Sequence, residues 1–309
     1  MPSHEDFGAA LRARIDKLIS VSRLIVNADD FGLTSGVNRS IIELHAAGVL
    51  TSATMMARAA ATDEAIDLAR NRPCLGVGCH IVLVDGAPML DRTMISSLLS
   101  RETGRFCPTL VSFLKRLFTG RIRAAEIEAE AGAQIARLQD VGLRVTHVDT
   151  HKHTHMFPRV LRPLLRAAKA AGIHMVRNPF EPLWSLNATR EAPDLRRLQV
   201  IALRRYEPAF LRIVAEEGFT TTDGAVGVLA TGTLDLGGVV ALLSAMPEGT
   251  FEMVTHPGYN DADLEHSQTR LLASRELERN ALLAISNFRG FELISFAALN
   301  SQIARTGSH

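Results

Sequence analysis

The chain has 309 residues, of which 47% are hydrophobic and 22% charged, as in an ordinary globular protein. Its formal net charge of +1 provides no strong field that would favour nucleic acid or an acidic membrane surface. We expect no transmembrane segment and no signal peptide, because no apolar run has the length or position of either. The three cysteines lack the spacing of a zinc ribbon or redox motif, which favours a reduced, cytoplasmic protein.

The first part of the chain predicts alternating strands and helices. Short apolar runs rich in β-branched residues indicate buried strands, and Thr34 or Ser35 is placed to cap a helix whose apolar residues recur at helical spacing. The expected elements are strands at 23–29, 51–57 and 76–83 and helices at about 35–48 and 62–70. This order, with its short connections, predicts a parallel sheet that is either open or closed into a barrel.

Residues 85–122 interrupt the alternation with Gly, Pro and scattered helix signals, so we expect an insertion or lid there. Further on, we expect less regular helices at residues 180–222. We expect a Gly/Thr-rich loop at about residues 220–238. The remaining expected elements are helices at 124–141, 159–171 and 264–287 and strands at 144–149, 174–177, 251–255 and 291–295. About seven strands with no internal repeat and no linker predict one α/β domain over 1–309, folded as a barrel or distorted barrel.

Two adjacent carboxylates, Asp29 and Asp30, close the first predicted strand. A single Asp in this position is often a turn former or a helix cap. Two like charges so close together require water or a cation. A bound metal ion would supply the cation and would leave one carboxylate free as a base.

A run from His147 to His155 alternates four histidines and Asp149 over nine residues. Residues two apart on a strand point the same way, so the run directs imidazoles and a carboxylate to one side. The alternative is a His-rich loop with adventitious metal affinity. The helix expected after Phe157-Pro158 means that part of the run lies beyond the strand.

His80 and His256 each follow a short apolar strand. His80, taken alone, is more simply explained as a structural histidine, and a structural role is an equal alternative for His256. Pro257 restricts His256 to an extended backbone, which would hold its side chain at the end of the strand. Because the carboxyl ends of barrel strands share one face, we expect these groups to meet the carboxylates there.

These residues supply one Asp and two His for a metal site with open coordination positions, which is typical of catalytic sites. Nitrogen and oxygen ligands fit zinc, iron, cobalt or manganese alike. A spare Asp and a spare His suit base and acid roles. The sequence has no phosphate-binding P-loop, no nucleophile elbow and no dinucleotide fingerprint.

Four motifs in the chain resemble the YdjC-type carbohydrate deacetylases, a family that includes chitooligosaccharide deacetylases. They are Asn-Ala-Asp-Asp-Phe-Gly at 27–32, Gly-Val-Gly-Cys-His at 76–80, the His-rich run at 147–155 and His-Pro-Gly-Tyr at 256–259. The resemblance spans about residues 23–299. It implies a distorted (β/α) TIM-like barrel related to polysaccharide deacetylases.

The resemblance also implies roles for individual residues. Asp30, His80 and His151 would bind one divalent ion, Zn²⁺ or Mg²⁺. Asp29 would be the catalytic base, and His256 would be the general acid by analogy with the wider deacetylase group. We expect Asp149 to orient an imidazole of the site, and His153 and His155 to contact sugar or to pack.

The substrate implied by the resemblance is an N-acetylated amino sugar. The long middle and the loop at 220–238 are most similar to a subgroup associated with hopanoid biosynthesis, which implies an N-acetylglucosaminyl hopanoid and peripheral binding at the inner membrane. The family also implies a homodimer. The alternatives are another metallohydrolase on the same barrel, such as a phosphoesterase, or a non-catalytic metal- or sugar-binding protein.

Overall fold

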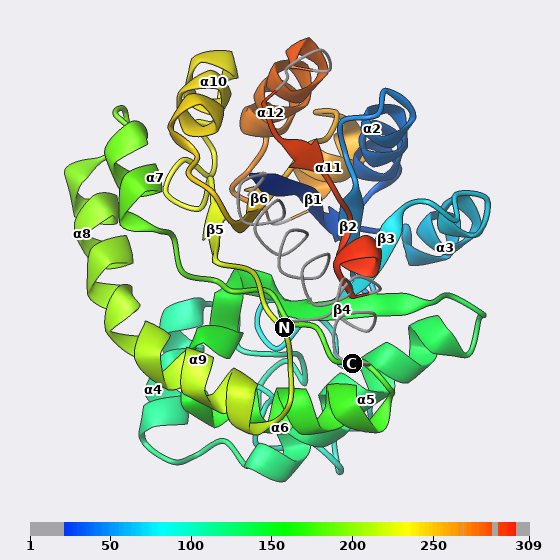
Figure 1. Ribbon diagram of the computed structural model, residues 1–309. Helices are drawn as coiled ribbons and strands as arrows, with labels where there is room; N and C mark the ends of the chain where they lie inside the picture. Colours follow the sequence, from blue (N-terminus) through cyan, green and yellow to red (C-terminus); the bar gives the residue numbers. More distant parts are fainter. Residues whose placement is uncertain (1–21, 268, 286–289, 301–309) are drawn as a thin grey trace, which may run out of the picture.

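The computed structural model describes residues 22–267, 269–285 and 290–300 (Figure 1). The described residues form a seven-stranded parallel sheet in the order β4-β3-β2-β1-β6-β5, with β7 paired to the start of β1. The strands are β1 Arg23–Phe31, β2 Ser52–Met55, β3 Gly76–Ile81, β4 Val145–Thr150, β5 Gly224–Val226, β6 Thr250–Thr255 and β7 Glu292–Leu293. The expected α/β fold with about seven parallel strands is therefore confirmed.

The helices lie around the outside of the strands (Figure 1). They are α2 Ser35–Ala46, α3 Thr62–Arg70, α4 Leu110–Phe118, α5 Ala124–Gln139, α6 Pro158–Ala170, α7 Leu183–Ala188, α8 Asp194–Leu203, α9 Glu207–Glu216, α10 Leu236–Ala245, α11 Ala262–His266 and α12 Ala273–Ala284. Two 3₁₀ turns, η1 His151–Met156 and η2 Arg204–Tyr206, complete the described elements. None of the described helices combines the length and the apolar character needed to cross a bilayer.

The barrel is distorted between β4 and β5. The strand expected at 174–177 is wrong as a regular element, since the described residues there make only isolated bridges, from Val176 to Val148 and from Met175 to Thr220. Val148 N donates to Met175 O at 3.0 Å, and Val176 N donates to Thr220 O at 3.1 Å. These few backbone hydrogen bonds connect the region between β4 and β5. The segment 174–177 is too short to form a regular strand.

Two other sequence expectations need correction. The helix expected at 264–287 is two helices, α11 and α12; residues 286 and 287 lie outside the described residues. Ser267 Oγ donates to Leu264 O, and Leu271 N donates to Thr269 Oγ1, so local side-chain bonds replace the helical ones at this break. The loop expected at 220–238 contains β5 and the first residues of α10, because a Gly-Ala-Val strand is too short to show periodicity.

A backbone irregularity at the end of β1 positions the adjacent carboxylates. The register between β1 and β2 shifts between Ala28 and Phe31, and Asp30 has a φ of 64°. Asp is one of the few residues that occupy this left-handed region readily. Such a bulge re-aims a side chain, and here it gives Asp29 and Asp30 different neighbours.

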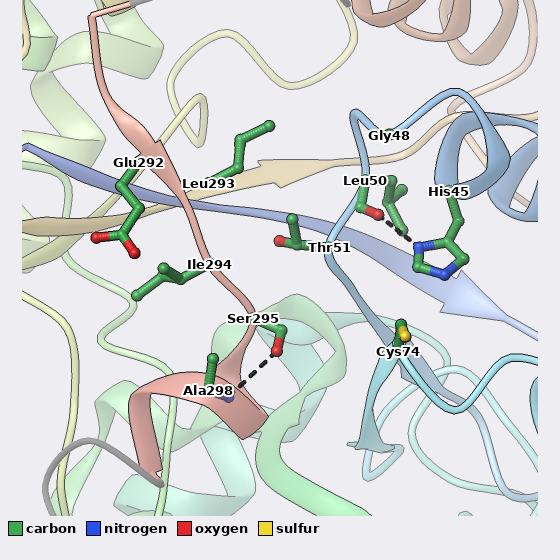
Figure 2. A pocket seen from close by; sticks show the side chains of 10 residues that line it. All are labelled: His45, Gly48, Leu50, Thr51, Cys74, Glu292, Leu293, Ile294, Ser295 and Ala298. Carbon is green, nitrogen blue, oxygen red and sulfur yellow. Dashed lines mark hydrogen bonds between the residues drawn. The ribbon is translucent and has the colours of Figure 1, made fainter.

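The pocket in Figure 2 has a volume of about 360 Å³ and lies away from these carboxylates. Its lining includes Leu50 and Thr51 just before β2, Cys74 just before β3, and Glu292 of β7. It therefore opens at the amino ends of the strands, whereas the site expected from the sequence lies at their carboxyl ends.

Candidate metal centre

Asp30, His80 and His151 converge at the carboxyl ends of β1, β3 and β4. Asp30 Oδ1 lies 3.7 Å from His80 Nε2 and 3.5 Å from His151 Nδ1, and the two ring nitrogens are 3.3 Å apart. Asp30 and His80 are buried, and the His151 side chain is 22% exposed. The barrel therefore encloses Asp30 and His80, and solvent reaches the cluster next to His151.

The three residues fit a divalent metal ion. Their ligand atoms all lie within 4.8 Å of one another. Asp30 Oδ1 is buried and accepts no hydrogen bond from any residue that the structure describes, which is a costly state unless another partner is bound. Two imidazole nitrogens and one carboxylate oxygen match the three-ligand pattern of catalytic sites.

A second acidic cluster, Asp29, His80 and Asp149, also lies within this range. Its carboxylate oxygens already bind protein donors: Asp29 accepts from Arg177, and Asp149 accepts from His80. The cluster built on Asp30 is therefore the better candidate for an ion.

Asp149 fixes the orientation of His80. His80 Nδ1 donates to Asp149 Oδ1 at 2.8 Å, which leaves Nε2 directed toward Asp30. Burial would lower the pKa of His80, but the carboxylates of Asp149 and Asp29 outweigh it and raise this pKa to about 9. A carboxylate behind a ligating imidazole is a common arrangement at metal sites.

Asp29 is buried beside the cluster and is held by several donors. Arg177 Nη2 donates to its Oδ1 at 2.6 Å and Nη1 to its Oδ2 at 2.9 Å, while Thr54 Oγ1 donates to Oδ1 at 3.1 Å. Burial would raise the pKa of Asp29, but the Arg177 guanidinium more than offsets this and holds the pKa well below its usual range. Asp29 is therefore ionised at neutral pH.

Arg177 is fully buried and shares its charge among three carboxylates. Besides Asp29, it forms ion pairs with Asp149 and with Glu252, whose Oε1 accepts from Nη2 at 2.6 Å and from Nε at 2.8 Å. Because one cation cannot compensate three buried anions, burial dominates at Glu252 and raises its pKa to about 7. The interior of the barrel is thus a charged network that links β1, β4 and β6.

His256 lies close to Asp29. Its Nε2 is 3.8 Å from Asp29 Oδ2, and its side chain is 13% exposed. Its backbone N–H donates to Glu278 Oε2 at 2.6 Å. Asp29 and His256 therefore stand beside the Asp30 cluster, as base and acid candidates would have to.

The His-rich run divides after β4. His151 opens the turn η1, in which Lys152 and His153 have positive φ values of 58° and 51°. His155 is fully buried, with Nδ1 bonded to Thr150 and Nε2 near Arg177 O, so neither ring nitrogen remains for a sugar. This geometry assigns His155 to packing.

Two other histidines of the run lie near the cluster. Burial lowers the pKa of His153 to about 3, so its imidazole is neutral at neutral pH; its Nδ1 has no hydrogen-bond partner in the described part of the chain. His147 stacks on Phe296 with ring centroids 3.8 Å apart and lies beneath the site rather than in it.

The sequence interpretation missed four charged residues of this region. Arg177 and Glu252 had a visible signal, since each is a charged residue within an apolar strand-like run. Arg275 and Glu278 of α12 had none, because charged residues are common on outer helices. Arg275 Nη2 donates to Asp30 Oδ2 at 2.5 Å. Burial opposes ionisation of Asp30, but Arg275 and His151 hold its pKa well below its usual range.

Residues 23–287 match the family described as YdjC-like protein. A carbohydrate deacetylase of Mus musculus is 33% identical over 247 residues, which are 77% of this chain and 78% of the mouse protein. A carbohydrate deacetylase of Brevibacillus brevis is 42% identical over 149 residues, and this match covers 48% of this chain and 56% of that relative's length.

A solved structure from Enterococcus faecalis, provisionally described as a cellobiose-phosphate cleavage protein, has a similar fold. It has a TM-score of 0.73 and 26% sequence identity, and the match covers 90% of this chain and 99% of the other. The family match spans most of the chain, and the match to the mouse protein spans more than two thirds of both proteins. The chain therefore belongs to the YdjC-like family.

Proposed function

We propose that the protein is a metal-dependent N-deacetylase that releases acetate from an N-acetylglucosamine-containing glycan or glycolipid. The observation that carries the proposal is the buried Asp30 Oδ1. It faces two imidazole nitrogens and lies beside an ionised carboxylate, Asp29, and a partly exposed imidazole, His256. The similarity to carbohydrate deacetylases supports the same reaction class, hydrolysis of a carbon–nitrogen bond.

Asp30, His80 and His151 would hold one divalent ion, Zn²⁺ or Mg²⁺. Such an ion lowers the pKa of a bound water to about 7 and polarises a carbonyl oxygen. Two imidazoles favour zinc over magnesium, which prefers oxygen ligands. Metal add-back to the stripped protein decides between them.

Asp29 would accept a proton from the attacking water. Arg177 keeps the Asp29 carboxylate ionised and fixes its orientation through two hydrogen bonds. The same contact makes Asp29 a weak base, so efficient proton acceptance depends on the acidity of the attacking water. Thr54, which donates to Asp29 Oδ1, supports the same orientation from β2.

His256 would donate a proton to the departing amine. Its Nε2 faces Asp29 Oδ2 at 3.8 Å, so base and acid occupy adjacent positions. Proton transfer by a positioned side chain typically contributes about 10²–10⁴-fold to a rate. The products are a free amino sugar and acetate.

We propose that residues 85–122 form a lid over the site. Lys152 Nζ donates to Asp85 Oδ2 at 2.7 Å, which joins the start of this insertion to the turn that carries His151. Both residues have a φ of 58°. We propose that the neutral His153, on the same turn, contacts a bound sugar.

The finer substrate assignment rests on the family resemblance. We propose an N-acetylglucosaminyl hopanoid as one candidate and a chitooligosaccharide as the other. The first implies action at the inner membrane surface, and the second implies a cytoplasmic sugar. A homodimer, also implied by the family, is tested by light scattering.

A substrate panel tests the proposal against its rivals. The protein is incubated with N-acetylated chitooligosaccharides, with an N-acetylglucosaminyl lipid and with phosphate monoesters. Equimolar acetate and free amine from an N-acetyl substrate support the deacetylase. Phosphate release without acetate would establish the phosphoesterase alternative, and binding without any product would indicate a metal- or sugar-binding protein.

A further inference from the structure

Helix α12 carries two buried charged side chains three residues apart, Arg275 and Glu278, which are 0% and 1% exposed. Residues at this spacing lie on the same face of a helix. Charged side chains are almost never fully buried unless they are paired. Both have their partners in the candidate site, although α12 itself lies outside the barrel.

Arg275 holds one oxygen of Asp30. Its Nη2 donates to Asp30 Oδ2 at 2.5 Å, and its Nε donates to Leu271 O at 3.0 Å. The other oxygen, Oδ1, is the one that faces His80 and His151. Because Oδ2 is occupied, Asp30 can offer only a single oxygen to an ion.

Glu278 holds the loop of His256. Its Oε2 accepts the His256 backbone N–H at 2.6 Å, and its Oε1 accepts the Gly232 backbone N–H at 3.3 Å. Glu278 Oε2 also lies 3.9 Å from His256 Nδ1, a buried nitrogen with no hydrogen-bond partner within the described ranges. The other titratable groups that face this imidazole are Asp29 of β1 and His153 of η1.

The loop after His256 packs directly on the stem of Arg275. Gly258 N donates to Arg275 O at 3.2 Å, and a Cβ at position 258 would lie 3.0 Å from Arg275 Cδ. A larger residue at position 258 would crowd the Arg275 side chain. The loop of His256, the carboxylate of Asp30 and α12 are thereby joined into one unit.

We propose that α12 positions both the candidate metal ligand Asp30 and the candidate general acid His256. Arg275 and Glu278 are the positioning residues. Arg275 restricts Asp30 to ligation through Oδ1. Glu278 aligns the backbone of His256 and faces its imidazole Nδ1. This inference rests on the proposed function, and it predicts that the two residues affect different steps.

The test compares Arg275→Gln and Glu278→Gln in the full chain. Arg212→Gln and Glu216→Gln are matched controls on α9, where the two exposed side chains lie 3.8 Å apart. Zn²⁺ affinity is measured by competition with a chromophoric chelator, acetate release gives kcat and KM, and NMR follows the backbone amide signal of His256. Arg275→Lys and Glu278→Asp replace any variant that fails to fold.

Arg275→Gln should weaken Zn²⁺ affinity by about 10–100-fold, the usual effect of removing a group that orients a ligand, and change the His256 backbone amide signal less than Glu278→Gln does. Glu278→Gln should keep Zn²⁺ affinity within about 2-fold and lower kcat by about 10-fold or more with little change in KM. It should also shift the His256 backbone amide signal, because the hydrogen-bond acceptor of that amide is changed. Both controls should match the wild-type protein in every measurement.

Wild-type Zn²⁺ affinity in Arg275→Gln, or an unchanged His256 backbone amide signal in Glu278→Gln, would overturn the corresponding half of the inference. Neither readout requires turnover. If the wild-type protein releases no acetate, the proposed function fails, while metal affinity and the His256 amide signal still decide what Arg275 and Glu278 do.

Discussion

His80 and Asp149 are joined by a hydrogen bond of 2.8 Å that decides which ring nitrogen faces the candidate metal centre. With Nδ1 donating to Asp149, only Nε2 is directed toward Asp30 and His151. Asp149 is itself paired to the buried Arg177. The orientation of His80 therefore depends on Asp149 and, through Asp149, on Arg177.

Asp149→Asn tests this orientation. The amide has nearly the same shape but no charge, so His80 should be less firmly held and a less effective ligand. We expect Zn²⁺ affinity to fall by about 10–100-fold. Equilibrium competition with a chelator measures it, and unchanged affinity would show that Asp149 does not act through His80.

His151→Ala should weaken metal binding strongly, because it removes one of three protein ligands. His174→Ala is the control, since His174 is an exposed histidine outside the site. Metal content after dialysis against a dilute chelator distinguishes the two. If both variants keep the wild-type metal content, His151 is not a ligand.

Asp29→Asn should separate chemistry from metal binding. The amide cannot accept the proton from water, so we expect kcat to fall by at least about 100-fold. Metal affinity should change little, because Asp30 and not Asp29 faces the two imidazoles. Loss of metal together with activity would mean that Asp29 belongs to the ligand set.

Glu252→Gln should change how stability depends on pH. Burial raises the pKa of Glu252 from 4.5 to about 7, so the folded state binds this proton more tightly than the unfolded state. The stabilisation is full below pH about 4.5 and is lost as the pH rises through about 7. Gln cannot titrate, so the variant should gain free energy of unfolding relative to wild type over this range, by at most about 1.4 kcal/mol per pH unit. Urea unfolding at several pH values measures the difference, and a constant difference would contradict the assignment.

Gly78→Ala should destabilise the barrel below the site. A Cβ at position 78 would lie 2.5 Å from the His147 ring, which is stacked on Phe296 and has little room to move. We expect a loss of about 1–3 kcal/mol in the free energy of unfolding. Gly132→Ala in α5 is the control: its Cβ would meet no described atom within 4 Å, and we expect a gain of about 0.5–1 kcal/mol. An equal change in the free energy of unfolding for Gly78→Ala and Gly132→Ala would show that the side chains around His147 are loosely packed.

The sequence predicted the parallel α/β fold because apolar strand runs and helical spacing alternate along most of the chain. It also placed Asp29, Asp30, His80 and His256 at strand ends, and the structure brings all four to one region. It could not reveal the isolated bridges at 174–177 or the short strand β5. Their pairing depends on neighbours far along the chain, and too few residues are involved to show a period.

The supporting charges were harder to predict than the site residues themselves. Arg177 reaches Asp29 across 148 positions of sequence, and Arg275 reaches Asp30 across 245. The apolar run around Arg177 is a local sign of burial, but nothing local marks Arg275 as buried or identifies the partner of either arginine. Adjacent carboxylates and alternating histidines have a local signature, whereas a compensating cation is defined only by the closed barrel.

Metal dependence is tested most directly by acetate release from N-acetylglucosamine substrates before chelation, after chelation and after add-back of Zn²⁺ or Mg²⁺, with Asp30→Asn in parallel. We predict release that chelation abolishes and one of these ions restores in the wild-type protein, with no restoration in Asp30→Asn at the same ion concentration. Release that survives complete metal removal, or equal restoration in Asp30→Asn, would contradict a metal centre built on Asp30, His80 and His151.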